Sequence, residues 1–200
     1  MFTGSYDGAV ALWTTDGVML WRRRGHEGHV NSTSFSPDAS CIASGGDDGS
    51  IALWSADGAL LWQVSGKAAH KRYRGRDHGI CLSPEEVRGI CFSPDGRRIA
   101  AGTYDGNVAL WSAGGDLLWQ VPGVPGNADI KVTFMGICFS PDGRRIAAGT
   151  QDGTVALWAD DGAPLWSAPW AWKRGFSNEG GPLGICSART ALASLLPKTA

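Results

Sequence analysis

Short apolar runs recur along the chain, and each run is bounded by a turn sequence. The runs are rich in Val, Ile, Ala, Leu and Trp, and either Asp-Gly or Ser-Pro-Asp-Gly separates one run from the next. Strands joined by such turns are typical of antiparallel hairpins. Between 88 and 121 the pattern predicts strands at about 88–93, 98–102, 107–111 and 116–121. Because 99–101 is apolar at every position, we expect these sheets to be covered on both faces.

This unit returns several times. Residues 89–106 recur almost letter for letter at 136–153, a looser copy covers 31–49, and half a copy begins at Phe2. Repetition at this length is the signature of stacked supersecondary units that bury each other's apolar faces. We therefore expect an all-β fold, a β-propeller built of four-stranded antiparallel blades.

Tryptophan marks two fixed positions in every unit. One ends the third predicted strand, and the other follows a glycine by four residues. The first row is Trp13, Trp54, Trp111 and Trp158, and the second is Trp21, Trp62, Trp119 and Trp166. A periodic aromatic row is more often core than a cofactor site, so we expect both rows to pack between blades.

Together these motifs resemble the WD repeat. The family pattern runs from Gly-His through Phe-Ser-Pro-Asp-Gly and Asp-Gly to Leu-Trp, and the likeness extends to about residue 181. The row of Gly-x-x-Leu-Trp departs from that pattern and is similar to the Trp-docking motif of quinoprotein-type propellers. Resemblance to WD repeats implies a non-catalytic scaffold that binds protein or peptide through loops on one rim.

The repeat period predicts the organisation of the chain. We expect a propeller region over 1–182, with blades at about 1–24, 29–64, 88–121 and 134–168 and an insertion at 65–87. About three blades are complete, and partial blades stand at both ends, as in a fragment of a larger ring. Residues 183–200 begin like a further repeat and then lose the pattern. A single-base shift after Cys186 could restore the repeat, so we interpret this tail as degenerate or frameshifted.

Two arrangements of the blades remain open from sequence alone. In an open arc, exposed blade faces and strand edges favour self-association. In a closed four-bladed ring, residues 183–186 would supply the inner strand that the first blade lacks. WD-type rings typically have more blades, which favours the arc.

The family resemblance also implies a structural tetrad that locks one blade. Its members here are His26, Ser44, Asp48 and Trp54. Elsewhere the serine position is occupied by Ala101 and Ala148. The same residue types could suggest a Ser-His-Asp hydrolase, but a nucleophile must lie in a cleft beside an oxyanion site. Since this set lies inside a repeat pattern, we predict that it locks the blade and has no catalytic residue, and that the protein is not an enzyme.

Two irregular segments are the candidate binding loops. The first holds Lys67, Lys71, Arg72, Tyr73, Arg74 and Arg76, and the second holds Trp170, Trp172, Lys173 and Arg174. A basic loop with a tyrosine could bind phosphate or RNA, although a solvated insertion is the simpler interpretation. Aromatic residues beside arginine are typical of a protein-binding hot spot, and covering an open propeller end is an equal alternative. Besides the scaffold, we keep an RNA or phosphate binder, a quinoprotein-like redox propeller and a non-functional truncated product as alternatives.

Composition narrows these classes further. The 18 Lys and Arg against 19 Asp and Glu give a formal charge of −1, so no global field attracts nucleic acid or an anionic membrane. No apolar window approaches the length of a membrane span, and the N-terminus lacks a signal peptide. The five cysteines have no Cys-x-x-Cys spacing, and Cys91 and Cys138 occupy equivalent strand positions, as small core residues do. We therefore expect a cytoplasmic protein with no metal and no cofactor.

Overall fold

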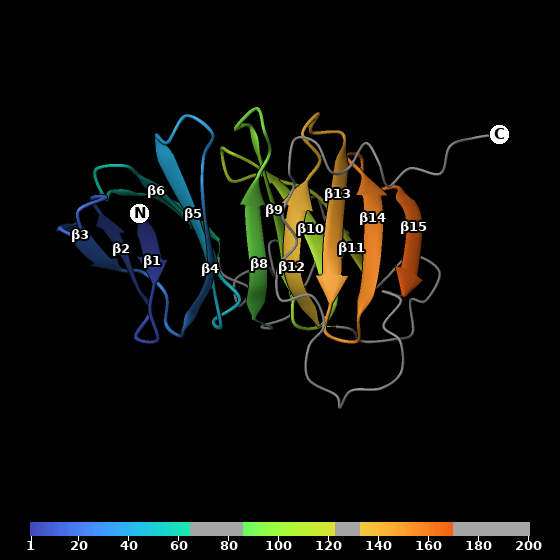
Figure 1. The fold of residues 1–200 in the computed structure, drawn as a ribbon, viewed down its shortest axis with the longest axis horizontal. Helices are drawn as coiled ribbons and strands as arrows, with labels where there is room; N and C mark the ends of the chain where they lie inside the picture. Colours follow the sequence, from blue (N-terminus) through green and yellow to red (C-terminus); the bar gives the residue numbers. More distant parts are fainter. Residues whose placement is uncertain (65–85, 123–132, 170–200) are drawn as a thin grey trace, which may run out of the picture.

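The computed structural model describes residues 1–64, 86–122 and 133–169, which form strands and turns in four sheets (Figure 1). The first sheet contains β1 (Phe2–Gly4), β2 (Ala9–Trp13) and β3 (Met19–Arg24). The second contains β4 (Val30–Phe35), β5 (Cys41–Gly46), β6 (Ile51–Ser55) and β7 (Leu60–Val64). The third contains β8 (Val87–Phe92), β9 (Arg98–Thr103), β10 (Asn107–Ser112) and β11 (Leu117–Pro122). The fourth contains β12 (Phe134–Phe139), β13 (Arg145–Thr150), β14 (Thr154–Ala159) and β15 (Pro164–Pro169).

Each sheet is an antiparallel meander whose strands pair in chain order. The four strands expected between 88 and 121 agree with β8–β11 to within one residue at each end. This confirms the prediction of an all-β fold of four-stranded antiparallel blades, with three strands in the first sheet. Within the described ranges there is no helix long and apolar enough to cross a membrane.

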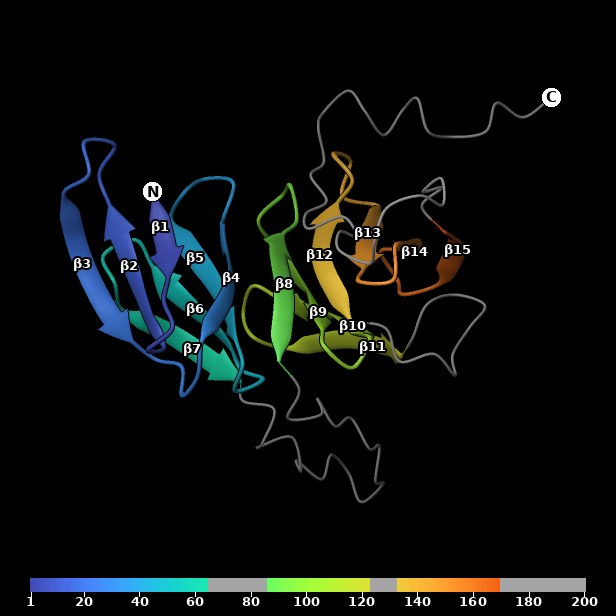
Figure 2. The ribbon, with the colours of Figure 1, turned by 60° about the horizontal axis from the view of Figure 1, so that its bottom comes forward.

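The sheets follow one another in chain order. The first strands of neighbouring sheets pack together, β1 against β4, β4 against β8 and β8 against β12. The first sheet and the fourth sheet lie at opposite ends of the described molecule (Figures 1 and 2). Each inner sheet is therefore covered on both faces by its neighbours in sequence.

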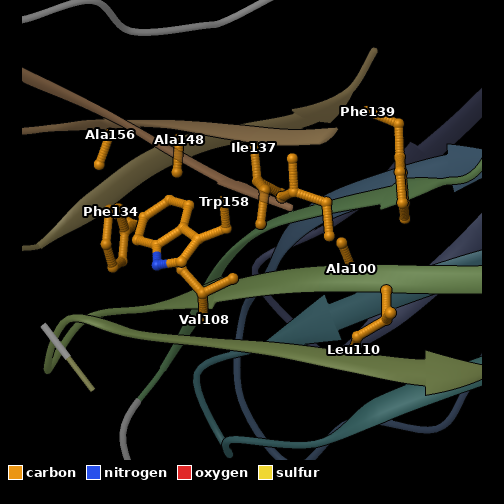
Figure 3. Close-up of a cluster of buried hydrophobic side chains, with 10 residues drawn as sticks. Ala100, Val108, Leu110, Phe134, Ile137, Phe139, Ala148, Ala156 and Trp158 are labelled. Atoms are coloured by element: carbon orange, nitrogen blue, oxygen red, sulfur yellow. The ribbon is translucent and has the colours of Figure 1, made fainter. Parts of the chain in front are cut away.

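Alternate side chains of one strand enter different cores. Ala100 belongs to the core between the third and fourth sheets, whereas Ala101 belongs to the core between the second and third. Figure 3 shows the first of these cores, where Val108 of the third sheet lies beside the rings of Phe134 and Trp158 of the fourth. Those two rings meet edge to face with centroids 5.9 Å apart. This arrangement is the reason why the strands are apolar on both faces.

The Ser-Pro-Asp turns hold the first two strands of a sheet in register. In the third sheet, the Arg98 N–H donates to Ser93 Oγ at 3.0 Å, and the Ser93 hydroxyl donates to Asp95 at 2.5 Å. The hydrogen bond from Ser93 and the Arg97 N–H lower the pKa of Asp95 below its ordinary value. The same arrangement recurs at Ser140. The repeated hairpin sequence thus encodes a side-chain brace as well as a turn.

Blade locks and a candidate interaction rim

The structure brings the four tetrad residues together in the second sheet. Ser44 is fully buried on β5, and its hydroxyl accepts a hydrogen bond from Trp54 Nε1 at 2.9 Å. His26 Nε2 lies 2.7 Å from the same oxygen, and His26 Nδ1 lies 3.3 Å from Asp48. Because an indole N–H can only donate, the Ser44 hydroxyl is able to give its own proton to a neutral His26. The result is a buried chain of hydrogen bonds from β6 to the turn that joins β5 and β6.

Further groups complete this network. The Ser50 hydroxyl lies 2.8 Å from His26 Nδ1 and donates to Asp48 at 2.7 Å. The Gln63 amide of β7 donates to Ser50 at 3.0 Å and to the Gly25 carbonyl at 2.7 Å. Sequence reasoning missed both residues, although the position after Asp-Gly is also polar at Asn107 and Thr154. The network therefore connects β5, β6 and β7 with the segment that precedes the second sheet.

Two kinds of side chain hold the turn aspartate in this fold. In the first, third and fourth sheets the residue two before the aspartate is Ser5, Thr103 or Thr150, and its hydroxyl donates to that aspartate. In the second sheet this position is Gly46, and a Cβ placed there would lie 2.7 Å from His26 Nδ1. His26 thus occupies the space that a hydroxyl side chain fills in the other sheets, so the tetrad is an alternative means of holding the same turn.

Thr3 is a further polar residue that sequence reasoning missed. It occupies in the first sheet the position of Ser44, and its hydroxyl accepts a hydrogen bond from Trp13 Nε1 at 2.9 Å. The first sheet thus contains the hydroxyl-to-tryptophan part of the network, with Ser5 in place of the histidine. At the same position the third and fourth sheets carry Ala101 and Ala148, both fully buried.

We expect the Asp48→Asn substitution to reduce the loss of stability in acid. Burial raises the pKa of Asp48, but hydrogen bonds from His26, Ser50 and the Glu27 N–H outweigh it and lower the pKa below 3.8. A lowered pKa in the folded state means that the ionised carboxylate stabilises the fold. This contribution is complete above the unfolded pKa and decreases as pH falls below it. Wild type should therefore lose more unfolding free energy than Asp48→Asn between about pH 5 and pH 3.

Urea unfolding at several pH values measures this difference. Asp16→Asn is the matched control, because Asp16 is exposed on a turn of the first sheet. Equal pH slopes for wild type and Asp48→Asn would contradict the role assigned to the carboxylate.

A second lock joins each sheet to the next. The indole of an outer strand donates from Nε1 to a backbone carbonyl in the turn that follows the third strand of the next sheet. The three bonds, each 2.9 Å long, run from Trp21 to Ala56, from Trp62 to Ala113 and from Trp119 to Asp160. In each turn the ring lies over a glycine with positive φ. A Cβ at Gly58, Gly115 or Gly162 would lie 2.8, 3.2 or 3.0 Å from an indole carbon. We call this arrangement the tryptophan lock.

The predicted packing of the two tryptophan rows holds for most members. Trp54, Trp111 and Trp158 are at most 2 % exposed. Trp13 is partly exposed, and Trp166 on β15 is 43 % exposed, which departs from the expectation that both rows lie between blades. These two residues belong to the first and fourth sheets, which have one neighbouring sheet each among the described residues.

The turn between β1 and β2 and the turns between the second and third strands of the other sheets lie at one edge of the molecule, the lower edge in Figure 1. Tyr6 there is 82 % exposed and meets His29 edge to face at 4.5 Å, and His29 lies 3.2 Å from Asp47. Tyr104 is 49 % exposed, and the Arg88 guanidinium lies 5.5 Å from its ring centre. We call this edge the turn rim and define it by Tyr6, His29, Asp47, Arg88 and Tyr104.

Sequence reasoning missed the turn rim. Its signal was the variable position in the otherwise repeated turn, which is occupied by Tyr6, Asp47, Tyr104 and Gln151. A position that varies where its neighbours repeat is free of the constraints that turn geometry and core packing impose. Exposed aromatic side chains at such positions are available for binding.

The two predicted binding loops are outside the described residues. The structure does not describe residues 65–85, 123–132 and 170–200. These ranges contain the basic residues from Lys67 to Arg76, the group from Trp170 to Arg174, the tail 183–200 and most of the insertion. They remain predictions.

Of the cysteines, Cys91 packs against the core of the third and fourth sheets, and burial raises the pKa of its thiol. Cys91 is partly buried and Cys138 is buried, so both behave as small core residues.

Comparison with known proteins agrees with this geometry. The family model described as WD domain, G-beta repeat matches residues 17–55, 76–112 and 125–159. The first match begins before β3 and ends with β6, so a family repeat comprises the outer strand of one sheet and three strands of the next. A curated relative, the Ribosome biogenesis protein WDR12 homolog of Chlamydomonas reinhardtii, is 29% identical over 120 residues. That alignment covers 58% of this chain and 26% of the relative. With the family model matching more than half of its length, this chain belongs to the WD-repeat family.

Proposed function

We propose that this chain is a non-catalytic scaffold that binds a protein or peptide through the turn rim. The observation that carries the proposal is the pair of exposed tyrosines, Tyr6 and Tyr104, on one edge of an otherwise core-forming repeat. Tyrosine provides a large apolar ring with a polar end and loses little side-chain entropy on binding, which is why it is enriched at binding hot spots. Membership of the WD-repeat family supports the same role.

The tetrad supports a structural role over a hydrolytic one. Ser44 is 0 % exposed, and its oxygen accepts a hydrogen bond from Trp54. A serine nucleophile needs an exposed oxygen beside donors that stabilise an oxyanion. The hydroxyl of Ser44 is buried and engaged in hydrogen bonds, and it connects β5 with β6.

The charges of the turn rim favour a protein partner over a nucleic acid. Arg88 is paired with Glu86, and His29 lies beside Asp47. Nucleic-acid binding depends on cations that are available to neutralise phosphates, whereas mixed charge around exposed aromatic rings is typical of protein interfaces. The similar Chlamydomonas protein is named for ribosome biogenesis, so we propose that the partner belongs to a ribosome-assembly complex.

We expect the double substitution Tyr6→Ala with Tyr104→Ala to weaken partner capture. Tagged full-length chain is used to capture proteins from a lysate of its own source, and the captured proteins are quantified by mass spectrometry. The double variant should retain the specific partners at least about tenfold less well, the effect of losing hot-spot aromatics. Its free energy of unfolding should change little, because both rings are largely exposed.

The matched control is Arg97→Ala with Arg144→Ala, two exposed residues on the turns at the opposite edge. This control should capture the same partners as wild type. Equal retention by wild type and the tyrosine variant would contradict the proposal. Loss of the partners after nuclease treatment would instead indicate binding through RNA.

A further inference from the structure

The parts of the tryptophan lock recur without a neighbouring sheet at the two ends of the described molecule. On the fourth sheet, Trp166 pairs with Leu157 in the register that places Trp119 opposite Leu110 in the third sheet. Trp119 is engaged in a lock, whereas the side chain of Trp166 is 43 % exposed. The fourth sheet therefore presents an exposed indole in the position from which the other sheets form their locks.

The first sheet presents the complementary part. Gly17 has a φ of +81°, close to the +88° of Gly58, but a Cβ placed on Gly17 would meet nothing within 4 Å. The Gly17 N–H donates to the Thr14 carbonyl at 3.3 Å, as the Gly58 N–H donates to Ser55. Thr15, which holds the position of the carbonyl acceptors in the three formed locks, is exposed. The turn at 14–17 is thus built like the occupied turns, and no indole of the described residues lies over its glycine.

The strand tryptophan is partly exposed only on the first sheet of the described residues, since Trp158 of the fourth sheet is 1 % exposed. Trp111, in an inner sheet, is 1 % exposed, whereas its counterpart Trp13 in the first sheet is partly exposed. In the fourth sheet the inner positions Cys138, Ala147 and Leu157 are buried. The open part of that face is therefore its outer strand, where Trp166 lies.

We propose that Trp166 of one copy of this chain docks on the turn at 14–17 of a second copy and forms a fourth tryptophan lock. Its Nε1 donates to the Thr15 carbonyl, and its ring covers Gly17. A second copy is the occupant because every chain carries both parts, and the parts lie on the sheets at opposite ends of the molecule (Figures 1 and 2). The contact reproduces an interface that the chain already makes three times within itself.

Such a contact is heterologous, because different surfaces of the two copies meet. Heterologous contacts produce a closed ring when the rotation closes and an open chain of subunits when it does not. The surface is separate from the turn rim, so the proposal does not depend on partner binding there.

Light scattering coupled to size exclusion, and sedimentation, both on the full-length chain over a range of concentrations, test the proposal. Wild type should show a mass that rises with concentration above that of the monomer. Trp166→Ala and Gly17→Ala should each weaken association at least about tenfold, because each removes one side of the lock. Both positions are exposed, so the variants should fold.

Two control variants separate the lock from general effects. Leu165→Ala removes a neighbouring side chain that is 47 % exposed. Gly153→Ala introduces the same backbone strain as Gly17→Ala, because Gly153 has a φ of +83° and open space around its Cβ position. Both controls should associate like wild type.

Mixing provides the sharpest test. Trp166→Ala keeps an intact turn and Gly17→Ala keeps an intact indole, so an equimolar mixture should form a dimer with one copy of each, although neither variant associates alone. Failure of the mixture to dimerise, or equal weakening by the control variants, would overturn the proposal. A wild-type chain that stays monomeric would also overturn it, and destabilisation of that monomer by Trp166→Ala would show that the lock closes within one chain.

Discussion

Trp111→Ala is expected to lower the free energy of unfolding by about 3–5 kcal/mol, the usual cost of removing a buried tryptophan from a core. The side chain is 1 % exposed and lies in the core between the second and third sheets. There it belongs to a cluster with Leu53 of the second sheet and Ile90 of the third. Its removal takes away apolar burial and leaves a cavity at a joint that two sheets share, so both lose stabilising contacts.

Urea unfolding of the full-length chain, followed by circular dichroism, measures this loss. Leu118→Ala is the control, because Leu118 lies on the neighbouring β11 and is 50 % exposed. The control should change the free energy of unfolding by no more than about 0.5 kcal/mol. A cost for Trp111→Ala as small as that of the control would show that the two sheets do not depend on this core.

Ser44→Ala is expected to cost about 2–6 kcal/mol, because it leaves two buried groups without a hydrogen bond at about 1–3 kcal/mol each. Those groups are Trp54 Nε1, 2.9 Å from the hydroxyl, and His26 Nε2, 2.7 Å from it. Ser40→Ala is the control, since Ser40 is exposed on a turn of the same sheet.

Ser44→Ala should lower the free energy of unfolding by less in a His26→Ala background than in wild type. In that background His26 Nε2, one of the two groups that lose a hydrogen bond, is already absent. Measuring both single variants and the double variant by urea unfolding gives this coupling energy. Additive effects would show that Ser44 and His26 act independently, contrary to a shared network.

Much of the fold could be predicted because each unit contains its own local instructions. Between 88 and 121, the Ser-Pro-Asp-Gly and Asp-Gly turns fix where strands end, and apolar runs fix which residues are buried, so the boundaries agree to within a residue. The same local signals recur in every unit, which predicts that the sheets stack. The tetrad residues were recognised by resemblance to the family, and the structure brings them together.

Other features depend on contacts that no local pattern encodes. Gln63 reaches Ser50 because β6 and β7 pair with Ala52 opposite Gln63, and that register is not written in either strand alone. His26 lies on the segment that connects the first two sheets, and it fills the space beside Gly46, which has no side chain and lies at the end of β5, before the turn to β6. The turn rim was missed for a similar reason, because Tyr6 and His29 meet only after the first two sheets have packed.

The cores between neighbouring sheets differ in size, so the sheets are expected to unfold with different degrees of cooperativity. Among the described residues, the core between the first and second sheets has four buried members, Val10, Ile42, Ala52 and Trp54, whereas the other two joints each have a larger core. In repeat proteins stability is approximately a sum of unit and nearest-neighbour terms, so partial unfolding begins where a coupling term is smallest. The first sheet is therefore the segment that separates at the lowest free energy. The tetrad extends from this joint into the second sheet, because Trp54 belongs both to the joint and to the tetrad.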